Sequence, residues 1–146
     1  MIRALAVLIF FTGTTRAEFL EIRVFIRDMN CESCTETLTA AFKRMRGVES
    51  VDVDFKAATV ALKFAPQNRL GVDQVWDAIK RVGFTPARTD VKVRGSVKGT
   101  KLEVPEINKT FEIDGPAPEG DSVELKGTTA PPPDPRTPVR IKIVEP

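Results

Sequence analysis

Beyond residue 17, the chain opens on an alternating pattern of apolar and polar positions. Apolar side chains stand at every second place: Leu20, Ile22, Val24 and Ile26. This period of two predicts a β-strand with one buried face. The pattern then changes, and apolar residues recur three or four places apart: Leu38, Ala41, Phe42 and Met45. We expect a helix here, begun by a capping box of Ser33 and Glu36 and ended by Gly47.

The next stretch predicts two strands and a second helix. Apolar residues alternate over 51–55 and again over 60–64, and the residues between are few enough for a hairpin. Residues 72–82 return to helical spacing, Gly83 is placed to end that helix, and a last strand begins at Phe84. The order strand, helix, strand, strand, helix, strand over 18–87 is the split βαβ, or ferredoxin-like, motif of an α+β sandwich.

The expected core of this first unit consists of apolar residues at the inward positions of these elements. Trp76 and Met45 also lie on the helical stripes and are predicted to be core. The other expected core residues are Leu20, Ile22, Val24, Met29, Leu38, Phe42, Val53, Val60, Leu62, Val75 and Ile79.

Composition changes near residue 88, which suggests a second unit over 88–146. Nine of the 11 prolines lie beyond that point, and no helical period is present there. Five short alternating stretches predict a small all-β barrel or sandwich, and the spacing of Gly115, Gly120 and Gly127 resembles a reduced OB-fold. Residues 130–135 contain four prolines and must form a loop, because proline cannot donate to a sheet ladder.

The first 17 residues resemble a secretory signal peptide. A short basic start is followed by the apolar run 4–11 and a polar stretch that ends in Thr15-Arg16-Ala17. The apolar run is far shorter than the ~20 residues that a membrane-spanning helix needs. We therefore expect cleavage after Ala17, a periplasmic or secreted location, and no membrane span in the mature chain. The predicted organisation is a signal peptide over 1–17, then units over 18–87 and 88–146.

Charge and composition exclude several functions. The chain has no histidine, which removes histidine-dependent catalytic pairs, metal ligands and pH switches. Its net charge is +2, and because Arg3 and Arg16 fall in the first 17 residues, the rest of the chain is neutral. A neutral chain gives no electrostatic drive toward nucleic acid or anionic membrane.

The only constellation in the sequence that can carry chemistry is Cys31-Glu32-Ser33-Cys34. It stands between the first predicted strand and the first predicted helix, so both thiols can point at a common centre. The helix N-terminus favours thiolates, and thiolates select soft cations such as Cu(I). Two ligands suit an ion of low coordination number, not structural zinc, which takes four.

Two other interpretations of the cysteine pair stay open. A structural disulfide is expected outside the cytoplasm, although so small a loop constrains the unfolded chain little. Thioredoxin-like redox proteins also place two cysteines at this spacing at a helix start. Here, however, Glu32-Ser33 separates the thiols, and 18–87 is too short for a thioredoxin sheet. The pattern favours metal binding.

Residues 19–87 resemble the heavy-metal-associated domain of copper chaperones, of copper-ATPase N-terminal modules and of the periplasmic mercury-binding protein. The matching motifs are Met29-x-Cys31-x-x-Cys34, Gly47-Val48-x-x-Val51-x-Val53, Thr59-Val60-x-Leu62-x-Phe64 and Gly83-Phe84. The resemblance implies that Cys31 and Cys34 bind one soft ion as thiolates. It also implies that Met29 is a buried anchor under the loop and that Phe84 lies near the loop.

This sequence departs from the family pattern where Asp28 replaces the usual glycine. Asp28 and Glu32 bring negative charge to the site, which disfavours a thiolate pair by like-charge repulsion. We expect a non-enzymatic protein that carries or sequesters Cu(I). Hg(II) or another soft ion is the alternative cargo, and a thiol–disulfide exchange protein or an interaction module with a structural disulfide is the alternative function. The expected protein is a monomer whose partner is a metal-transfer protein.

Overall fold

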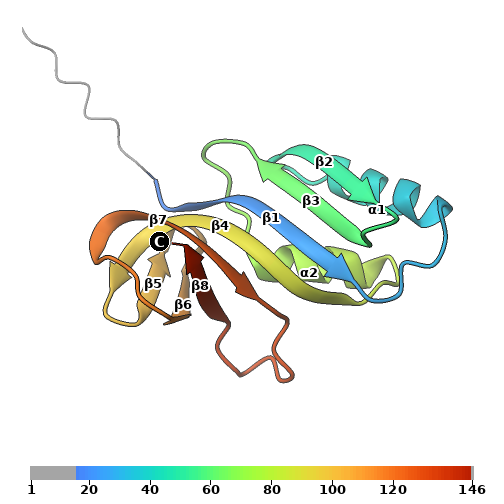
Figure 1. Cartoon of the computed structure of the whole chain (residues 1–146). Coiled ribbons are helices and arrows are strands. Elements are labelled where there is room, and N and C mark those ends of the chain that lie inside the picture. Colours follow the sequence, from blue (N-terminus) through green and yellow to red (C-terminus); the bar gives the residue numbers. More distant parts are fainter. Residues whose placement is uncertain (1–15, 146) are drawn as a thin grey trace, which may run out of the picture.

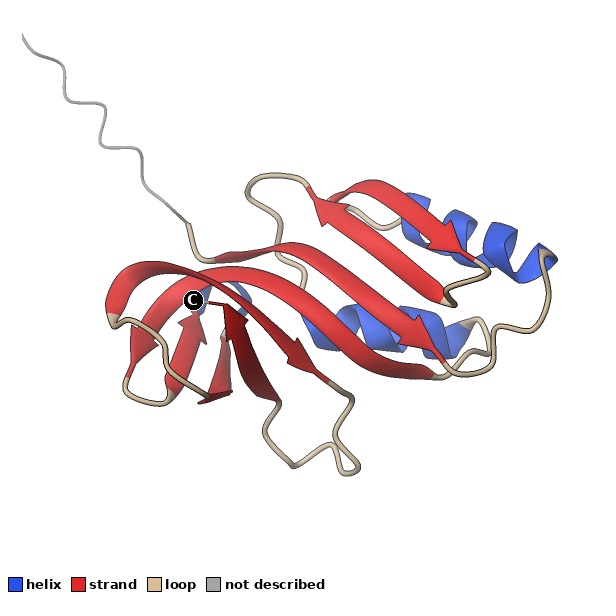
Figure 2. Ribbon diagram, viewed as in Figure 1, coloured by secondary structure: helices blue, strands red, loops and turns tan. Residues whose placement is uncertain are grey.

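The computed structural model describes residues 16–145, so the predicted signal peptide lies outside it except for Arg16 and Ala17. The first unit contains the elements in the predicted order: β1 (Glu18–Ile26), α1 (Ser33–Lys43), β2 (Val48–Asp54), β3 (Thr59–Phe64), α2 (Val72–Arg81) and β4 (Pro86–Lys98). Its strands form an antiparallel sheet in the order β2-β3-β1-β4. Both helices cover one face of this sheet (Figures 1 and 2). The predicted ferredoxin-like sandwich is confirmed.

The second unit is a small closed barrel. Beyond β4 it consists of β5 (Lys101–Val104), a 3₁₀ turn η1 (Pro105–Ile107), β6 (Lys109–Asp114), β7 (Gly120–Thr129) and β8 (Arg140–Glu145). The strands follow the order β4-β5-β6-β8-β7, and β7 pairs again with β4, which closes the ring. Among the strands that the structure describes, only β6 and β8 pair in parallel. This is a five-stranded Greek-key barrel, the architecture of an OB-fold.

One strand, β4, belongs to both units. Its residues 86–94 pair with β1, its residues 96–98 pair with β5, and its opposite edge pairs with β7. The last strand expected for the first unit and the first strand expected for the second are therefore one continuous element, which sweeps from the sheet into the barrel (Figure 1). Gly95 stands where β4 leaves β1 for β5, and a Cβ there would lie 2.6 Å from the Glu103 carbonyl oxygen.

Most of the expected core is buried, but Leu20, Val53 and Met45 are only half-buried. Leu20 is only half-buried, because a β-bulge between Phe19 and Glu21 shifts the strand phase and places Phe19 in the core. Val53 is also half-buried, since β2 is an edge strand of the sheet. Trp76 is buried as predicted, and its Nε1 donates a hydrogen bond of 2.9 Å to Thr89 Oγ1 in β4.

Met45 packs against the core from a half-buried position at the end of the first helical stripe. Gly47 and Gly83 have φ angles of +97° and +92°, which fits their predicted role in ending the two helices. Within residues 16–145, no helix is both long and apolar enough to cross a membrane.

Candidate metal-binding site

The two cysteines lie at the junction of β1 and α1. Cys31 is half-buried in the connecting loop, and Cys34 is the second residue of α1 and almost fully buried. Their Cα atoms are 5.3 Å apart, and a disulfide joins the two sulfurs. The backbone N–H of Cys34 donates to the Cys31 carbonyl at 3.2 Å. The structure therefore brings the pair to one point, as the sequence predicts, in its oxidised form.

The start of α1 differs from the predicted capping box. Ser33 is the first helical residue rather than the cap, and its hydroxyl donates to Cys31 Sγ at 3.6 Å. Glu32 occupies the N-cap position without a capping side-chain hydrogen bond. Thr35 Oγ1 donates instead to the Glu32 carbonyl at 2.6 Å. The hydroxyl expected to cap the helix thus contacts the sulfur that would bind a metal.

The loop before Cys31 is fixed from two sides. Met29 has 9% of its surface exposed and belongs to the hydrophobic core. The Asp28 carboxylate accepts hydrogen bonds from the Thr85 backbone N–H at 2.8 Å and from Thr85 Oγ1 at 3.0 Å. The bond from the Thr85 N–H is the main reason why the pKa of Asp28 lies below its usual value. Phe84, which the resemblance placed near the loop, is half-buried and directly precedes Thr85.

A shallow groove of about 740 Å³ runs beside the cysteine loop, between the start of α1 and β2 with the turn that follows it. Its charged lining residues are Glu32, Glu36, Asp52, Asp54 and Lys56. The sequence pattern pointed to charge at Asp28 and Glu32 only. The acidic residues of β2 are far from the cysteines along the chain, and only the packing of the hairpin beside α1 brings them here.

The donors present fit a two-coordinate soft ion once the disulfide is reduced. Reduction adds two electrons and two protons and frees both thiols. Transfer of those protons to water or another base, as the ion binds, gives the thiolates that hold soft cations. Among residues 16–145, no cluster of three or more His, Cys, Asp or Glu side chains could hold a metal. A closed four-ligand cage is therefore not formed by the part of the chain that the structure describes.

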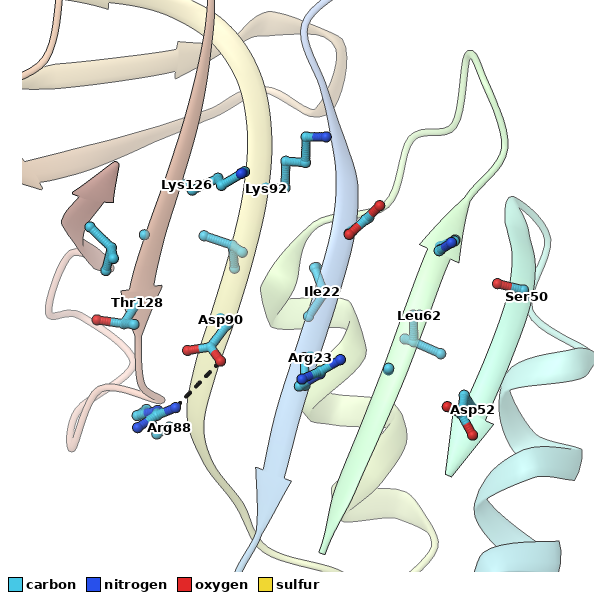
Figure 3. A pocket seen from close by; sticks show the side chains of 16 residues that line it. Ile22, Arg23, Ser50, Asp52, Leu62, Arg88, Asp90, Lys92, Lys126 and Thr128 are labelled. Atoms are coloured by element: carbon cyan, nitrogen blue, oxygen red, sulfur yellow. Dashed lines mark hydrogen bonds and ion pairs between the residues drawn. The ribbon is translucent and has the colours of Figure 1, made fainter. Parts of the chain in front are cut away.

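A second hollow, of about 770 Å³, lies on the sheet face opposite the helices, across β2, β3, β1, β4 and β7 (Figure 3). Arg88 and Asp90 form an ion pair of 3.4 Å there. Nearby, desolvation raises the pKa of Glu124, but hydrogen bonds and charge from Lys92 and Arg94 outweigh this and lower it overall. The lining includes Lys and Arg as well as Asp and Glu side chains and no cysteine or methionine, so it is not a soft-metal site.

The fold and the cysteine loop define a ferredoxin-like domain with two thiols at a strand–helix junction. Residues 23–85 match the family model of the heavy-metal-associated domain. Domains of this family are typically metal-binding modules rather than catalysts. No curated protein matches the chain.

Several solved structures are similar to about half of the chain. The CopZ metallochaperone is 24% identical, with a TM-score of 0.42, over 45% of this chain and 97% of that one. Oxidized MerP from Ralstonia metallidurans CH34 is 21% identical, with a TM-score of 0.44, over 48% and 96%. The yeast copper transporter domain Ccc2a is 19% identical, with a TM-score of 0.42, over 49% and 93%.

Proposed function

We propose that this protein binds one Cu(I) ion through the thiolates of Cys31 and Cys34 and passes it to another protein. The observation that carries the proposal is the convergence of two cysteines, in a loop and at a helix start, within a heavy-metal-associated domain. Two soft donors without a third suit an ion of low coordination number. Hg(II) has the same preference and is the alternative cargo.

Transfer by ligand exchange follows from the openness of the site. Cys31 is half-buried on a loop, so a thiolate of another protein can approach the ion from outside. The incoming thiolate adds as a third ligand, and one of the two cysteines then leaves, so that the ion is never released into water. The acidic groove beside the loop supports a partner whose docking face is basic, because such a face would meet four carboxylates there.

The test of metal binding uses protein purified reduced and under anaerobic conditions. Native mass spectrometry after addition of Cu(I) should show one retained ion in the wild type and none in the Cys31→Ser, Cys34→Ser double variant. Met45→Leu is the matched control, since Met45 is a sulfur-bearing side chain just beyond the far end of α1, and it should retain the ion. Met29→Leu should also retain it, because Met29 acts as a core anchor. Retention of copper by the double variant would refute the proposed site.

Thiol–disulfide exchange is the second candidate function, and the Cys31–Cys34 disulfide at a helix N-terminus favours it. The mass spectrometry above separates the two candidates when it is paired with an insulin-reduction assay. Turnover in that assay without a retained metal ion would favour exchange chemistry. A retained ion without turnover would favour metal transport.

We also propose that the protein is exported and that the mature chain begins at Glu18. The support is the basic start, apolar run and Thr15-Arg16-Ala17 ending of the first 17 residues. N-terminal sequencing of protein recovered from outside the cytoplasm of an expressing bacterium should give Glu18 first. Recovery of full-length protein only from the cytoplasm would contradict export.

A further inference from the structure

The loop that carries Cys31 is tied to a distant part of the chain at one residue, Thr85. Thr85 directly precedes β4, and it bonds to the loop in three ways. Its carbonyl accepts from the Arg27 backbone N–H at 3.1 Å, its N–H donates to Asp28 Oδ1 at 2.8 Å, and its hydroxyl donates to Asp28 Oδ2 at 3.0 Å. Both oxygens of one carboxylate are therefore held by one residue on the neighbouring loop.

No other side-chain hydrogen bond within residues 16–145 joins this loop to another element. The bonds made by Ser33 and Thr35 remain within the loop and the first turn of α1. Met29 adds an apolar anchor. Because apolar contacts are not directional, it keeps the loop close to the core but does not orient the loop backbone. The Asp28–Thr85 tether is thus the directional constraint on the segment that leads to Cys31, three residues further along.

The two cysteines differ in how firmly the fold holds them. Cys34 lies in the first turn of α1 and has 8% of its surface exposed, so helix and core set its position. Cys31 is half-buried and its position depends on the path of the loop. Joining two sulfurs, by a disulfide or through an ion, costs less when the loop is already ordered, because less conformational entropy remains to be lost.

We propose that Asp28 and Thr85 are positioning residues that hold Cys31 opposite Cys34. They thereby make the disulfide harder to reduce and raise the metal affinity of the two thiolates. The effect on metal affinity rests on the proposed function, whereas the effect on reduction requires only that the disulfide forms. Asp28 has two opposite effects on the metal affinity of the site. Its hydrogen bonds order the loop, while its negative charge disfavours thiolates nearby. Thr85 contributes to the ordering alone, and so the two effects are separable by mutation.

The test equilibrates the full chain with mixtures of reduced and oxidised dithiothreitol. The protein disulfide takes two electrons and two protons from the dithiol, which closes to its own cyclic disulfide. Alkylation and mass spectrometry then give the oxidised fraction. For Thr85→Val we expect an equilibrium about threefold to tenfold further toward the reduced protein, the size of one ordinary intramolecular hydrogen bond. A tenfold shift corresponds to about 30 mV.

Companion variants separate the tether from charge and from folding. Asp28→Ala should shift the equilibrium in the same direction, and the Asp28→Ala, Thr85→Val double variant should shift it no further than Asp28→Ala alone. Asp28→Asn keeps an acceptor for the Thr85 N–H and should shift it less than Asp28→Ala. Asp134→Ala is the matched control, because Asp134 also accepts a backbone N–H in an exposed turn, in the β7–β8 loop. It should leave the equilibrium unchanged.

Cu(I) competition against a colorimetric chelator supplies the second measurement. Reduced Thr85→Val should bind Cu(I) several-fold more weakly than the reduced wild type. If the wild type binds no Cu(I), the proposed function fails, and the redox equilibrium alone decides the tether. If Thr85→Val and Asp28→Ala fold with wild-type thermal midpoints but have the wild-type redox equilibrium, the positioning role is refuted. Equal shifts in Asp134→Ala would refute it as well.

Discussion

The ring of Phe19 in β1 meets the ring of Phe111 in β6 edge to face, with centroids 5.5 Å apart and planes at 83°. Phe19 belongs to the ferredoxin-like unit and Phe111 to the barrel, and both are almost fully buried. Together with the shared strand β4, this contact makes the two units one continuous hydrophobic core. The barrel is therefore not an independent appendage on the ferredoxin-like unit.

Removing the Phe111 ring should destabilise the whole chain. Phe111→Ala is expected to lower the free energy of unfolding by about 3–5 kcal/mol, because it leaves a cavity between the units. Urea unfolding followed by circular dichroism and by Trp76 fluorescence should show one shared transition at a lower midpoint. Trp76 reports on the ferredoxin-like unit, so a Trp76 transition unchanged from wild type would contradict a common core. Val144→Ala, at a side chain that is 68% exposed, is the control and should change little.

A methyl group at Gly95 should disturb the point where β4 leaves the sheet for the barrel. A Cβ there would lie 2.6 Å from the Glu103 carbonyl oxygen and 2.8 Å from Leu102 Cδ1, so the β4–β5 pairing must shift. We expect Gly95→Ala to cost about 1–3 kcal/mol of unfolding free energy, as overpacking does. Gly120→Ala is the comparison, since its new methyl meets only the Val123 side chain at 3.1 Å, and should cost less. Thermal unfolding measures both, and equal midpoints would count against a close approach at Gly95.

Acid should loosen the cysteine loop through Asp28. The pKa of Asp28 is lowered in the folded chain, so its contribution is fully present above the ordinary aspartate pKa of about 4 and is lost as pH falls through the folded value. The rate at which a phosphine reduces the disulfide, expressed per unprotonated phosphine, should therefore rise as pH falls below about 4. The Asp28→Asn variant should lack this rise. A rise of the same size in both proteins would assign the pH effect to another group.

Oxidation should switch metal binding off. The disulfide between Cys31 and Cys34 has no thiolate to offer, so the oxidised protein should bind no Cu(I) after free thiols are blocked. Equilibrium dialysis against a Cu(I)–chelator complex measures this, with reduced protein as the positive control. One equivalent of Cu(I) bound by the blocked, oxidised protein would place the site away from the cysteines.

The sequence predicted the first unit well because its apolar periods are regular and its turns carry glycine at Gly47 and Gly83. It failed at Leu20, because a β-bulge changes the phase of a strand without a mark in the apolar pattern. It also treated β4 as two strands. The change of composition near residue 88 reflects the start of the barrel, but a strand can continue through such a change when both of its edges find partners.

The spacing in the sequence is enough to predict the cysteine pair, but it does not predict the residues that surround the pair in the fold. Asp28 departs from the family glycine, and the sequence alone indicates only unfavourable charge there. Its bonds to Thr85 depend on the meeting of two loops 57 residues apart, which no local pattern encodes. The acidic groove was missed for the same reason, since Asp52 and Asp54 reach it only through the β2–β3 hairpin.

The position of β2 has a consequence for association with other chains. In the described sheet order, closure of the barrel leaves β2 as the only strand with a single neighbour, so its outer edge offers unpaired backbone groups to any extended peptide. Exposed acidic side chains stand along it at Glu49, Asp52 and Asp54. Such charges on an open edge oppose self-templated strand addition, because two copies would bring like charges together. Electrostatic repulsion thus opposes fibril-like growth at the outer edge of β2.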